Sequence, residues 1–174
     1  VVTSGFSDYE AASKKIASLN GVVSVSPIVK GQVMATANGK NKGVEVFGET
    51  LANVKKLPLI INPESSMGSV ESFDKGVAIG SGIARSLGLR IGDIITLISP
   101  NGAKTAFGTS PRISGFEIVY IFQVGRYDID NTRIYMPLLD AQTYFNRENL
   151  VDEFEIMVSY PENVGNLKSL LINV

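Results

Sequence analysis

Three short groups of polar residues have types and spacings that could support chemistry. Ser72 and Lys75 match the Ser-x-x-Lys spacing of serine–lysine acyl enzymes. The Gly-Ser-Gly sequence at 80–82 follows an apolar run, as in the turn of a dinucleotide-binding unit. The Asp-Ile-Asp-Asn sequence at 128–131 offers oxygen donors of the kind that begin a calcium loop. Nucleophilic catalysis, nucleotide binding and calcium binding are therefore the kinds of site to weigh.

Each of these groups lacks residues that its chemistry needs. The Ser-x-x-Lys pattern requires a buried lysine at the start of a helix, but residues 72–75 lie in an acidic, turn-like stretch. The third small position of the glycine motif is Arg85, and the calcium loop lacks both its glycine and its bidentate glutamate. We interpret the three groups as a solvated loop, a helix start and a turn held by Asx hydrogen bonds.

The composition excludes several further classes of function. The 174 residues include no cysteine and no histidine, which removes disulfides, thiol nucleophiles, the commonest general base and the commonest transition-metal ligand. The net charge of −1 provides no broad cationic surface for nucleic acid. We therefore predict a chain that is not an enzyme, has no cofactor and no metal, and does not bind nucleic acid; an enzyme that uses only carboxylates and lysines stays open but has no positive support.

The first third of the chain has the pattern of one helix followed by strands. Ser7 and Glu10 form a predicted capping box for a helix that ends near residue 20. Alternating apolar residues then predict a three-stranded meander over 23–29, 32–37 and 44–47. A short helix at 50–57 should end at Pro58, and Pro27 should place its strand at an edge or a bulge.

The rest of the chain alternates between the two element types, so the predicted fold class is α+β. The Pro-, Ser- and Gly-rich segment 62–76 is predicted to be a crossover between subdomains. Beyond it, the pattern predicts helices at 81–87 and 138–145, a final helix capped by Asn163, and strands at 93–98, 116–124, 132–136 and 154–159. The strand at 116–124 is apolar at nearly every position and should be buried on both faces.

One loop between predicted strands differs from the others. Pro100 and Pro111 bracket ten mostly small or polar residues, among which Phe107 is the only large apolar side chain. A hairpin with five of these residues in each arm could project by about 15 Å, at about 3.3 Å per extended residue. Phe107 either folds back onto its own domain or anchors a partner protein, and the residues alone leave both readings open.

The order of several motifs resembles one family of membrane-transport proteins. GSGIARSLGLRIGD at 80–93 is similar to a stretch shared by the periplasmic core domains of MacB/FtsX-type permeases. ITLISP at 95–100, followed by TAFG at 105–108 and Pro111, resembles the LolC/LolE lipoprotein-releasing family more narrowly. Further similar segments are FQVGRYDID at 122–130, YMPLLDAQ at 135–142, GQVM at 31–34 and DY at 8–9.

This resemblance implies an architecture of two subdomains. It implies a MacB-like periplasmic core in which a β-rich Sabre-like unit is inserted into a split Porter-like α/β unit. The expected boundaries are 1–61 for the first Porter-like part, 62–150 for the Sabre-like insertion and 151–174 for the second, truncated Porter-like part. We also expect the chain to be the periplasmic part of a longer bacterial inner-membrane protein.

The resemblance also implies a function and a set of binding residues. Such permeases release lipoproteins from the inner membrane, powered by a cytoplasmic LolD-like ATPase on a separate subunit. The implied partners are a soluble LolA-like lipoprotein carrier, the lipoprotein cargo and a second permease subunit, which can be another copy of the same chain. A protruding hairpin called the hook binds the carrier, and here it comprises Pro100, Asn101, Gly102, Ala103, Lys104, Thr105, Ala106, Phe107, Gly108, Thr109, Ser110 and Pro111. Arg112 is the candidate for a polar pad beside the hook.

Two other functions compete with this one. The chain could belong to a related MacB-like or FtsX-like permease that transmits force to a different partner, such as an adaptor protein or a cell-wall hydrolase. A hydrolase that uses Ser72 and Lys75 is the third possibility, and a covalent adduct with an acyl-enzyme probe would reveal it.

Overall fold

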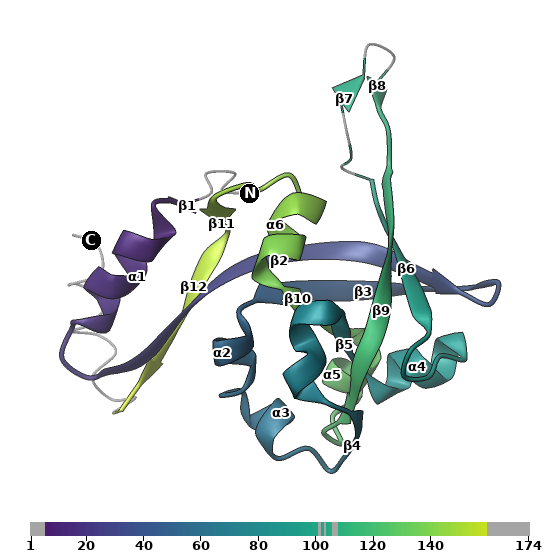
Figure 1. Ribbon diagram of the computed structural model, residues 1–174, viewed down its shortest axis with the longest axis horizontal. Coiled ribbons are helices and arrows are strands. Elements are labelled where there is room, and N and C mark those ends of the chain that lie inside the picture. The colour runs from purple at the N-terminus through teal and green to yellow at the C-terminus, as the bar shows by residue number, and fades with distance from the viewer. Residues whose placement is uncertain (1–5, 101, 103, 106–107, 160–174) are drawn as a thin grey trace.

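The computed structural model describes residues 6–100, 102, 104–105 and 108–159 (Figure 1). The helices are α1 (Tyr9–Ala17), α2 (Leu51–Val54), α3 (Pro58–Ile61), the 3-10 helix η1 (Val70–Lys75), α4 (Ser81–Leu87), α5 (Tyr127–Thr132) and α6 (Leu138–Tyr144). The strands are β1 (Phe6–Ser7), β2 (Val22–Ala37), β3 (Lys40–Glu49), β4 (Ser65–Gly68), β5 (Val77–Gly80), β6 (Ile94–Ser99), β7 (Lys104–Thr105), β8 (Gly108–Thr109), β9 (Arg112–Gln123), β10 (Arg133–Pro137), β11 (Leu150–Val151) and β12 (Glu153–Val158).

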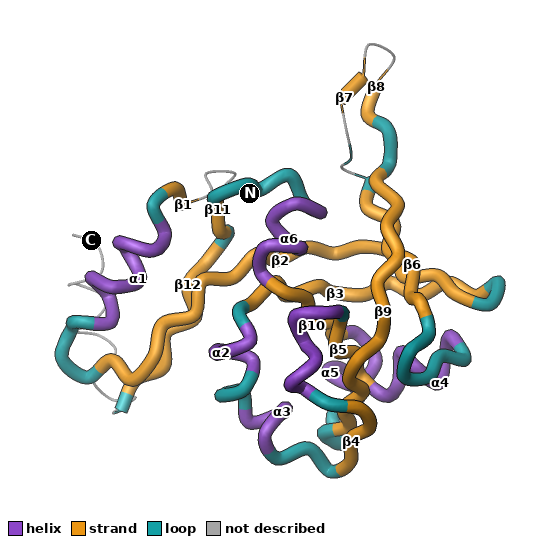
Figure 2. Tube along the Cα trace, viewed as in Figure 1, coloured by secondary structure: helices purple, strands orange, loops and turns teal. Residues whose placement is uncertain are grey.

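The central strands form a closed ring of hydrogen-bonded neighbours. The order around the ring is β2, β3, β10, β5, β9, β6 and back to β2. The β3–β10 and β5–β9 pairs are parallel, whereas the other pairs are antiparallel. The two parallel pairs join segments that are far apart in the sequence, and helices lie against this ring (Figure 2).

The ring divides the apolar side chains into two clusters. Alternate residues of the ring strands, such as Val33, Val46 and Leu97, pack in one cluster with α4 and α6. A second cluster contains Phe47 and Tyr135 and is covered by buried residues of α2, α3 and η1. Every residue from 118 to 122 is buried because β9 contributes side chains to both clusters. This confirms the prediction of a strand buried on both faces.

The two ends of the described chain lie beside each other. β1 pairs with β11, and β12 pairs with residues 22–28 of β2 (left in Figure 1). Pro27 occurs in this half of β2, where β12 is the only paired neighbour within the described part of the chain. That position fits the prediction of an edge location, because proline cannot donate to a second neighbour.

The predicted meander is instead one long hairpin. β2 runs unbroken for 16 residues and β3 returns along it after a tight turn at Asn38 and Gly39, whose φ values are 49° and 71°. Positive φ at both central residues is typical of a hairpin turn that matches the strand twist. Gly31 lies within β2 and does not interrupt it. Glycine is needed at this position because a Cβ would occupy the space of the Phe145 ring.

Several other local predictions were wrong or incomplete. The capping box is wrong: Ser7 belongs to β1, and the N-cap of α1 is Asp8 in a left-handed conformation without a side-chain cap. Pro58 begins α3, since proline suits the first turn of a helix. The elements β4 and α5 were not predicted, and the helix expected at Asn163 lies outside the described residues.

Candidate functional site

The candidate hook extends from the end of the β6–β9 pair, a part of the ring that we call the stem. β6 and β9 pair from Ile94 opposite Glu117 to Ser99 opposite Arg112. Beyond this stem, β7 and β8 pair with Lys104 opposite Thr109 and project past the other elements (top of Figure 1). A hairpin that projects in this way can present its surface to a partner.

Two prolines and a glycine shape the point where the stem becomes the hairpin. Pro100 and Pro111 are both exposed. Pro100 follows Ser99 and Pro111 precedes Arg112, the two residues of the last stem pair. A Cβ on Gly102 would collide with the carbonyl oxygen of Ser110 and with the backbone of the two following residues. The two chains therefore approach here more closely than any larger residue would allow.

The structure describes the predicted hook residues unequally. Lys104, Thr105, Gly108 and Thr109 form the β7–β8 pair, and Gly102, Ser110 and the two prolines lie at its base. Asn101, Ala103, Ala106 and Phe107 lie outside the described residues. The assignment of the hook residues to carrier binding stays a prediction.

Arg112 is bound by the end of α6. Its Nη1 donates to the carbonyl oxygen of Thr143, and its Nη2 donates to Oδ1 of Asn146 at 2.6 Å. Burial raises the pKa of the neighbouring Tyr144 hydroxyl to about 12, although the positive charge of Arg112 acts in the opposite direction. The pad role of Arg112 stays a prediction. Thr143 and Asn146 were missed because they follow Arg112 by 31 and 34 residues, with no local motif to link them.

Apolar residues line the outer wall of the ring at the base of the hairpin. Met34, Ile98 and Ile113 lie opposite one another on three adjacent strands, β2, β6 and β9. Met34 and Ile113 are exposed by 47% and 61%, so this row faces solvent. An open groove of about 670 Å³ adjoins it, and its lining includes Met34, Ile98, Pro100 and Pro111.

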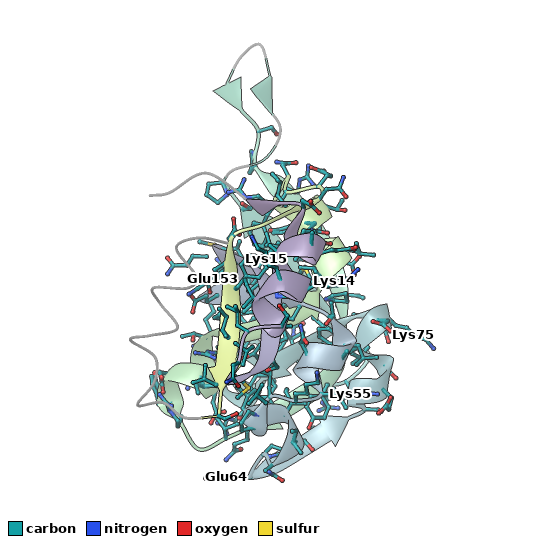
Figure 3. All side chains as sticks on the ribbon, turned by 90° about the vertical axis from the view of Figure 1, so that its left-hand side faces the viewer. Lys14, Lys15, Lys55, Glu64, Lys75 and Glu153 are labelled. Carbon is teal, nitrogen blue, oxygen red and sulfur yellow. The ribbon has the colours of Figure 1, made fainter. Side chains whose placement is uncertain are left out.

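The residues of the possible serine–lysine site do not form the arrangement that this chemistry needs. Ser72 is partly buried within η1, whereas Lys75 ends the same helix and extends outward into solvent (Figure 3). A catalytic lysine in such a site must be buried, whereas Lys75 is exposed. The interpretation as a solvated loop is wrong for the backbone, because residues 70–75 form a 3-10 helix in which Phe73 is fully buried, but the exposure of Lys75 agrees with it.

The glycine motif has a packing role. Gly80 ends β5 and Gly82 lies in the first turn of α4. Cβ atoms on them would collide with the backbone of Asp130 and the side chain of Asn131, respectively. The two glycines therefore allow α5 to lie directly against the β5–α4 junction.

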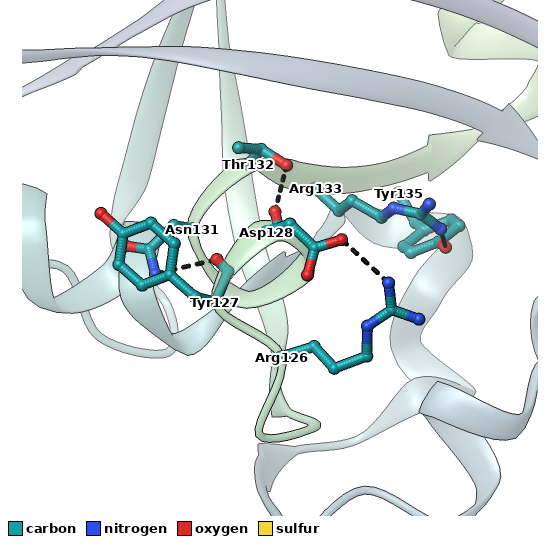
Figure 4. A network of polar contacts seen from close by, with 7 residues as sticks. All are labelled: Arg126, Tyr127, Asp128, Asn131, Thr132, Arg133 and Tyr135. Atoms are coloured by element: carbon teal, nitrogen blue, oxygen red, sulfur yellow. Dashed lines mark hydrogen bonds and ion pairs between the residues drawn. The ribbon is translucent and has the colours of Figure 1, made fainter.

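The acidic group at 128–131 is satisfied by local hydrogen bonds. The Asp130 carboxylate accepts from the backbone N–H groups of Val124 at 2.8 Å and Gly125 at 3.1 Å. Asp128 pairs with Arg126 at 3.0 Å, and Asn131 donates to the carbonyl oxygen of Tyr127 (Figure 4). The interpretation as a turn held by Asx hydrogen bonds is therefore wrong in its backbone, because residues 127–132 form the helix α5, although the polar side chains are held by local hydrogen bonds.

The described residues lack two other kinds of feature. No cluster of three or more acidic side chains there is arranged to hold a metal ion. Among the helices within those same ranges, none has the length and hydropathy required to cross a bilayer.

Residues 2–169 match the family described as the MacB-like periplasmic core domain. The chain belongs to this family. Its fold is similar to the extracellular domain of the noncanonic ABC-type transporter YknZ from Gram-positive bacteria, with a TM-score of 0.63, 14% identity and coverage of 97% of this chain and 83% of that one. The periplasmic region of MacB from Actinobacillus actinomycetemcomitans has a TM-score of 0.61 and 8% identity, covering 98% and 73%. The predicted α+β MacB-like fold is confirmed.

Two curated relatives of this MacB-like domain are transmembrane proteins of lipoprotein-releasing systems. The transmembrane protein LolC of the lipoprotein-releasing system of Neisseria meningitidis serogroup B is 26% identical over 87% of this chain. The corresponding protein LolE of Haemophilus influenzae is 29% identical over 86% of it. This confirms the resemblance to the LolC/LolE family. The chain spans 37% of the LolC protein and 36% of the LolE protein.

Proposed function

We propose that this MacB-like domain is the periplasmic part of an ABC permease that releases lipoproteins and recruits their soluble carrier through the hook. The observation that carries the proposal is the β7–β8 hairpin, which projects past the ring on the β6–β9 stem in a chain similar to LolC and LolE. In this proposal the domain works with a second permease subunit and a separate ATPase, and its own role is binding and force transmission.

The binding step would use one aromatic anchor on a narrow support. Phe107 is the only large apolar residue between the two prolines, and burying such a ring in a partner contributes about 1.5–3 kcal/mol. The carrier must already possess an apolar cavity for acyl chains, and that cavity would also accept the ring. The exposed row of Met34, Ile98 and Ile113 lies at the foot of the same hairpin.

A binding measurement tests this proposal. We expect the 174-residue chain to bind the purified soluble lipoprotein carrier of the same organism in isothermal titration calorimetry. Phe107→Ala should weaken binding about tenfold, because about 1.4 kcal/mol of contact energy is lost. The matched control is Tyr127→Ala, which removes an aromatic side chain that is 81% exposed on α5.

Three results of this measurement would separate the alternatives. Equal carrier binding by Phe107→Ala and the unmodified chain would rule out the hook assignment. Equal weakening by Tyr127→Ala would show that the effect is not specific to the hairpin. Capture of an adaptor protein or a cell-wall hydrolase, with no binding of the carrier, would favour the MacB-like or FtsX-like alternative.

We also propose a division of the domain into two subdomains. The sequence predicts boundaries at residues 61 and 150, and this division stays a prediction. The pairing of β12 with residues 22–28 supports a unit built from both chain ends. Because β2 pairs with β3 from residue 29 onward, we propose that the first boundary lies inside β2 instead of at residue 61.

A further inference from the structure

We propose that Arg112 is a positioning residue, which fixes the direction of the hairpin by tying the first residue of β9 to the end of α6. This inference rests on the proposed function, because the direction of the hairpin matters only if a partner must meet it. The structural part of the inference can nevertheless be tested without any partner.

The two hydrogen bonds of Arg112 hold it at a definite angle. A planar guanidinium that donates through both terminal nitrogens restricts rotation more than a single bond does. The Thr143 carbonyl lies in the last turn of α6, where a cation is favoured, and it accepts the Arg112 bond in addition to a long bond of 3.4 Å from the Asn146 backbone N–H. Asn146 adopts a φ of 55°, which turns the chain sharply just after α6, and its side-chain oxygen accepts the second bond.

Aromatic packing joins β9 to α6 at a second point, four residues further along β9. Phe116 is four residues after Arg112 on β9, so both side chains lie on the same face of the strand. Its ring meets Tyr144 of α6 edge-on, with centroids 5.7 Å apart, and Tyr144 in turn contacts Phe145 at 4.9 Å. The stem is therefore joined to the end of α6 at two levels, by a charged group and by rings.

The connection continues from α6 to the ends of the described chain. Arg147 donates to the Asp152 carboxylate at 3.0 Å, and the same carboxylate accepts from the backbone N–H of Lys30 on β2. The segment between Arg147 and Asp152 includes β11, which pairs with β1. A displacement of the terminal strands would therefore be passed to α6 and through Arg112 to the base of the hairpin.

The position of Arg112 makes it the last such contact before the hairpin. Pro111 precedes it directly, and the β6–β9 pairing ends at Arg112 opposite Ser99. Beyond this pair, β7 and β8 pair only with each other in the described part of the chain. Loss of the Arg112 contacts would thus free the hairpin to swing about its base, while the ring keeps its own pairing.

Pulsed electron–electron double resonance, which measures the distance between two spin labels, tests the positioning role directly. The chain contains no cysteine, so Thr109→Cys on β8 and Leu139→Cys on α6 introduce the only labelling sites. Leu139 is 73% exposed, so its label should not disturb the core. We expect one narrow distance distribution, which becomes about twice as broad in Arg112→Gln and in Asn146→Gly. Asn146→Gly removes one acceptor and tolerates the positive φ.

A control variant and a stability measurement complete the design. Arg126→Gln removes an exposed arginine that pairs only locally with Asp128, and it should leave the distribution unchanged. Thermal unfolding of each variant should show a cooperative transition, which separates a mobile hairpin from an unfolded chain. Narrow distributions in both Arg112→Gln and Asn146→Gly would overturn the inference.

Carrier affinity separates this role from a direct contact. If Arg112 positions the hairpin, Arg112→Gln and Asn146→Gly should both lower carrier affinity by about three- to tenfold, because a mobile hairpin must be ordered on binding. Weaker binding by Arg112→Gln alone would indicate that Arg112 touches the carrier, and would contradict the positioning role. If the unmodified chain does not bind the carrier, the proposed function fails, and the distance measurement still decides the role of Arg112.

Discussion

At the scale of single residues, Glu49 is a buried carboxyl group whose loss of hydration is offset by few hydrogen bonds or opposite charges. It ends β3 with 1% of its surface exposed, and its Oε2 has no hydrogen-bond partner among the described residues. Burial raises its pKa to about 7, the negative charge of Glu155 adds to this, and Arg133 opposes it. Glu49 lies on β3 of the ring, whereas Glu155 lies on β12, so their repulsion acts between the ring and the terminal strands.

The raised pKa of Glu49 predicts how stability depends on pH. The unfolded chain loses this proton near pH 4.5, but the folded chain keeps it until about pH 7. The free energy of unfolding should therefore fall as the pH rises from 4.5 through 7, by about 3 kcal/mol for this group. Glu49→Gln should remove that part of the dependence in urea titrations at pH 5 and pH 8. The exposed Glu148→Gln is the control, and an unchanged pH dependence in Glu49→Gln would contradict the prediction.

At the scale of elements, close backbone approach decides where α5 can pack. Gly80 has ordinary extended backbone angles, so only space and not conformation requires glycine there. The Asp130 carboxylate accepts from the backbone of Val124 and Gly125, just after β9, and so ties α5 to the end of that strand. This short helix thus depends on two glycines and one aspartate as well as on the buried Ile129.

Substitution of these glycines tests the packing argument. Gly80→Ala should lower the free energy of unfolding by roughly 1–3 kcal/mol, because its Cβ would collide with backbone that cannot move alone. Gly43→Ala on β3 is the matched control, since a Cβ there meets no atom within 4 Å. Equal stability of the two variants in chemical denaturation would show that the β5–α5 contact can relax.

At the scale of the whole molecule, the ring and the terminal strands differ in how they are held. Residues 118–122 of β9 are all buried, whereas β12 has no fully buried residue and pairs with β2 on one side. Local opening of a protein follows burial and pairing of this kind. The two proposed subdomains should consequently differ in local stability.

Hydrogen–deuterium exchange detected by mass spectrometry can measure this difference. We expect amides in residues 153–158 to exchange at least about tenfold faster than those in residues 118–122. Residues 22–28, which pair with β12, should exchange together with that strand. Uniform protection of all three segments would indicate a single cooperative unit and would argue against the proposed division.

Local sequence signals determined the elements whose pattern is complete within a few residues. Gly88 ends α4 in a left-handed conformation, and the apolar run in β9 marks a strand buried on both faces. The absence of cysteine and histidine limited the possible chemistry, and the ordered motifs indicated the family. Such features depend on residue type and short spacing, which a sequence states directly.

Only the tertiary structure decided which distant segments meet. The parallel pairing of β3 with β10, the closure of the ring by β6 and the acceptors of Arg112 join residues that no repeat or spacing connects. The burial of Glu49 likewise depends on elements outside its own strand. These contacts are selected by the burial of apolar surface across the whole chain, and local patterns carry no information about which partner strand will supply it.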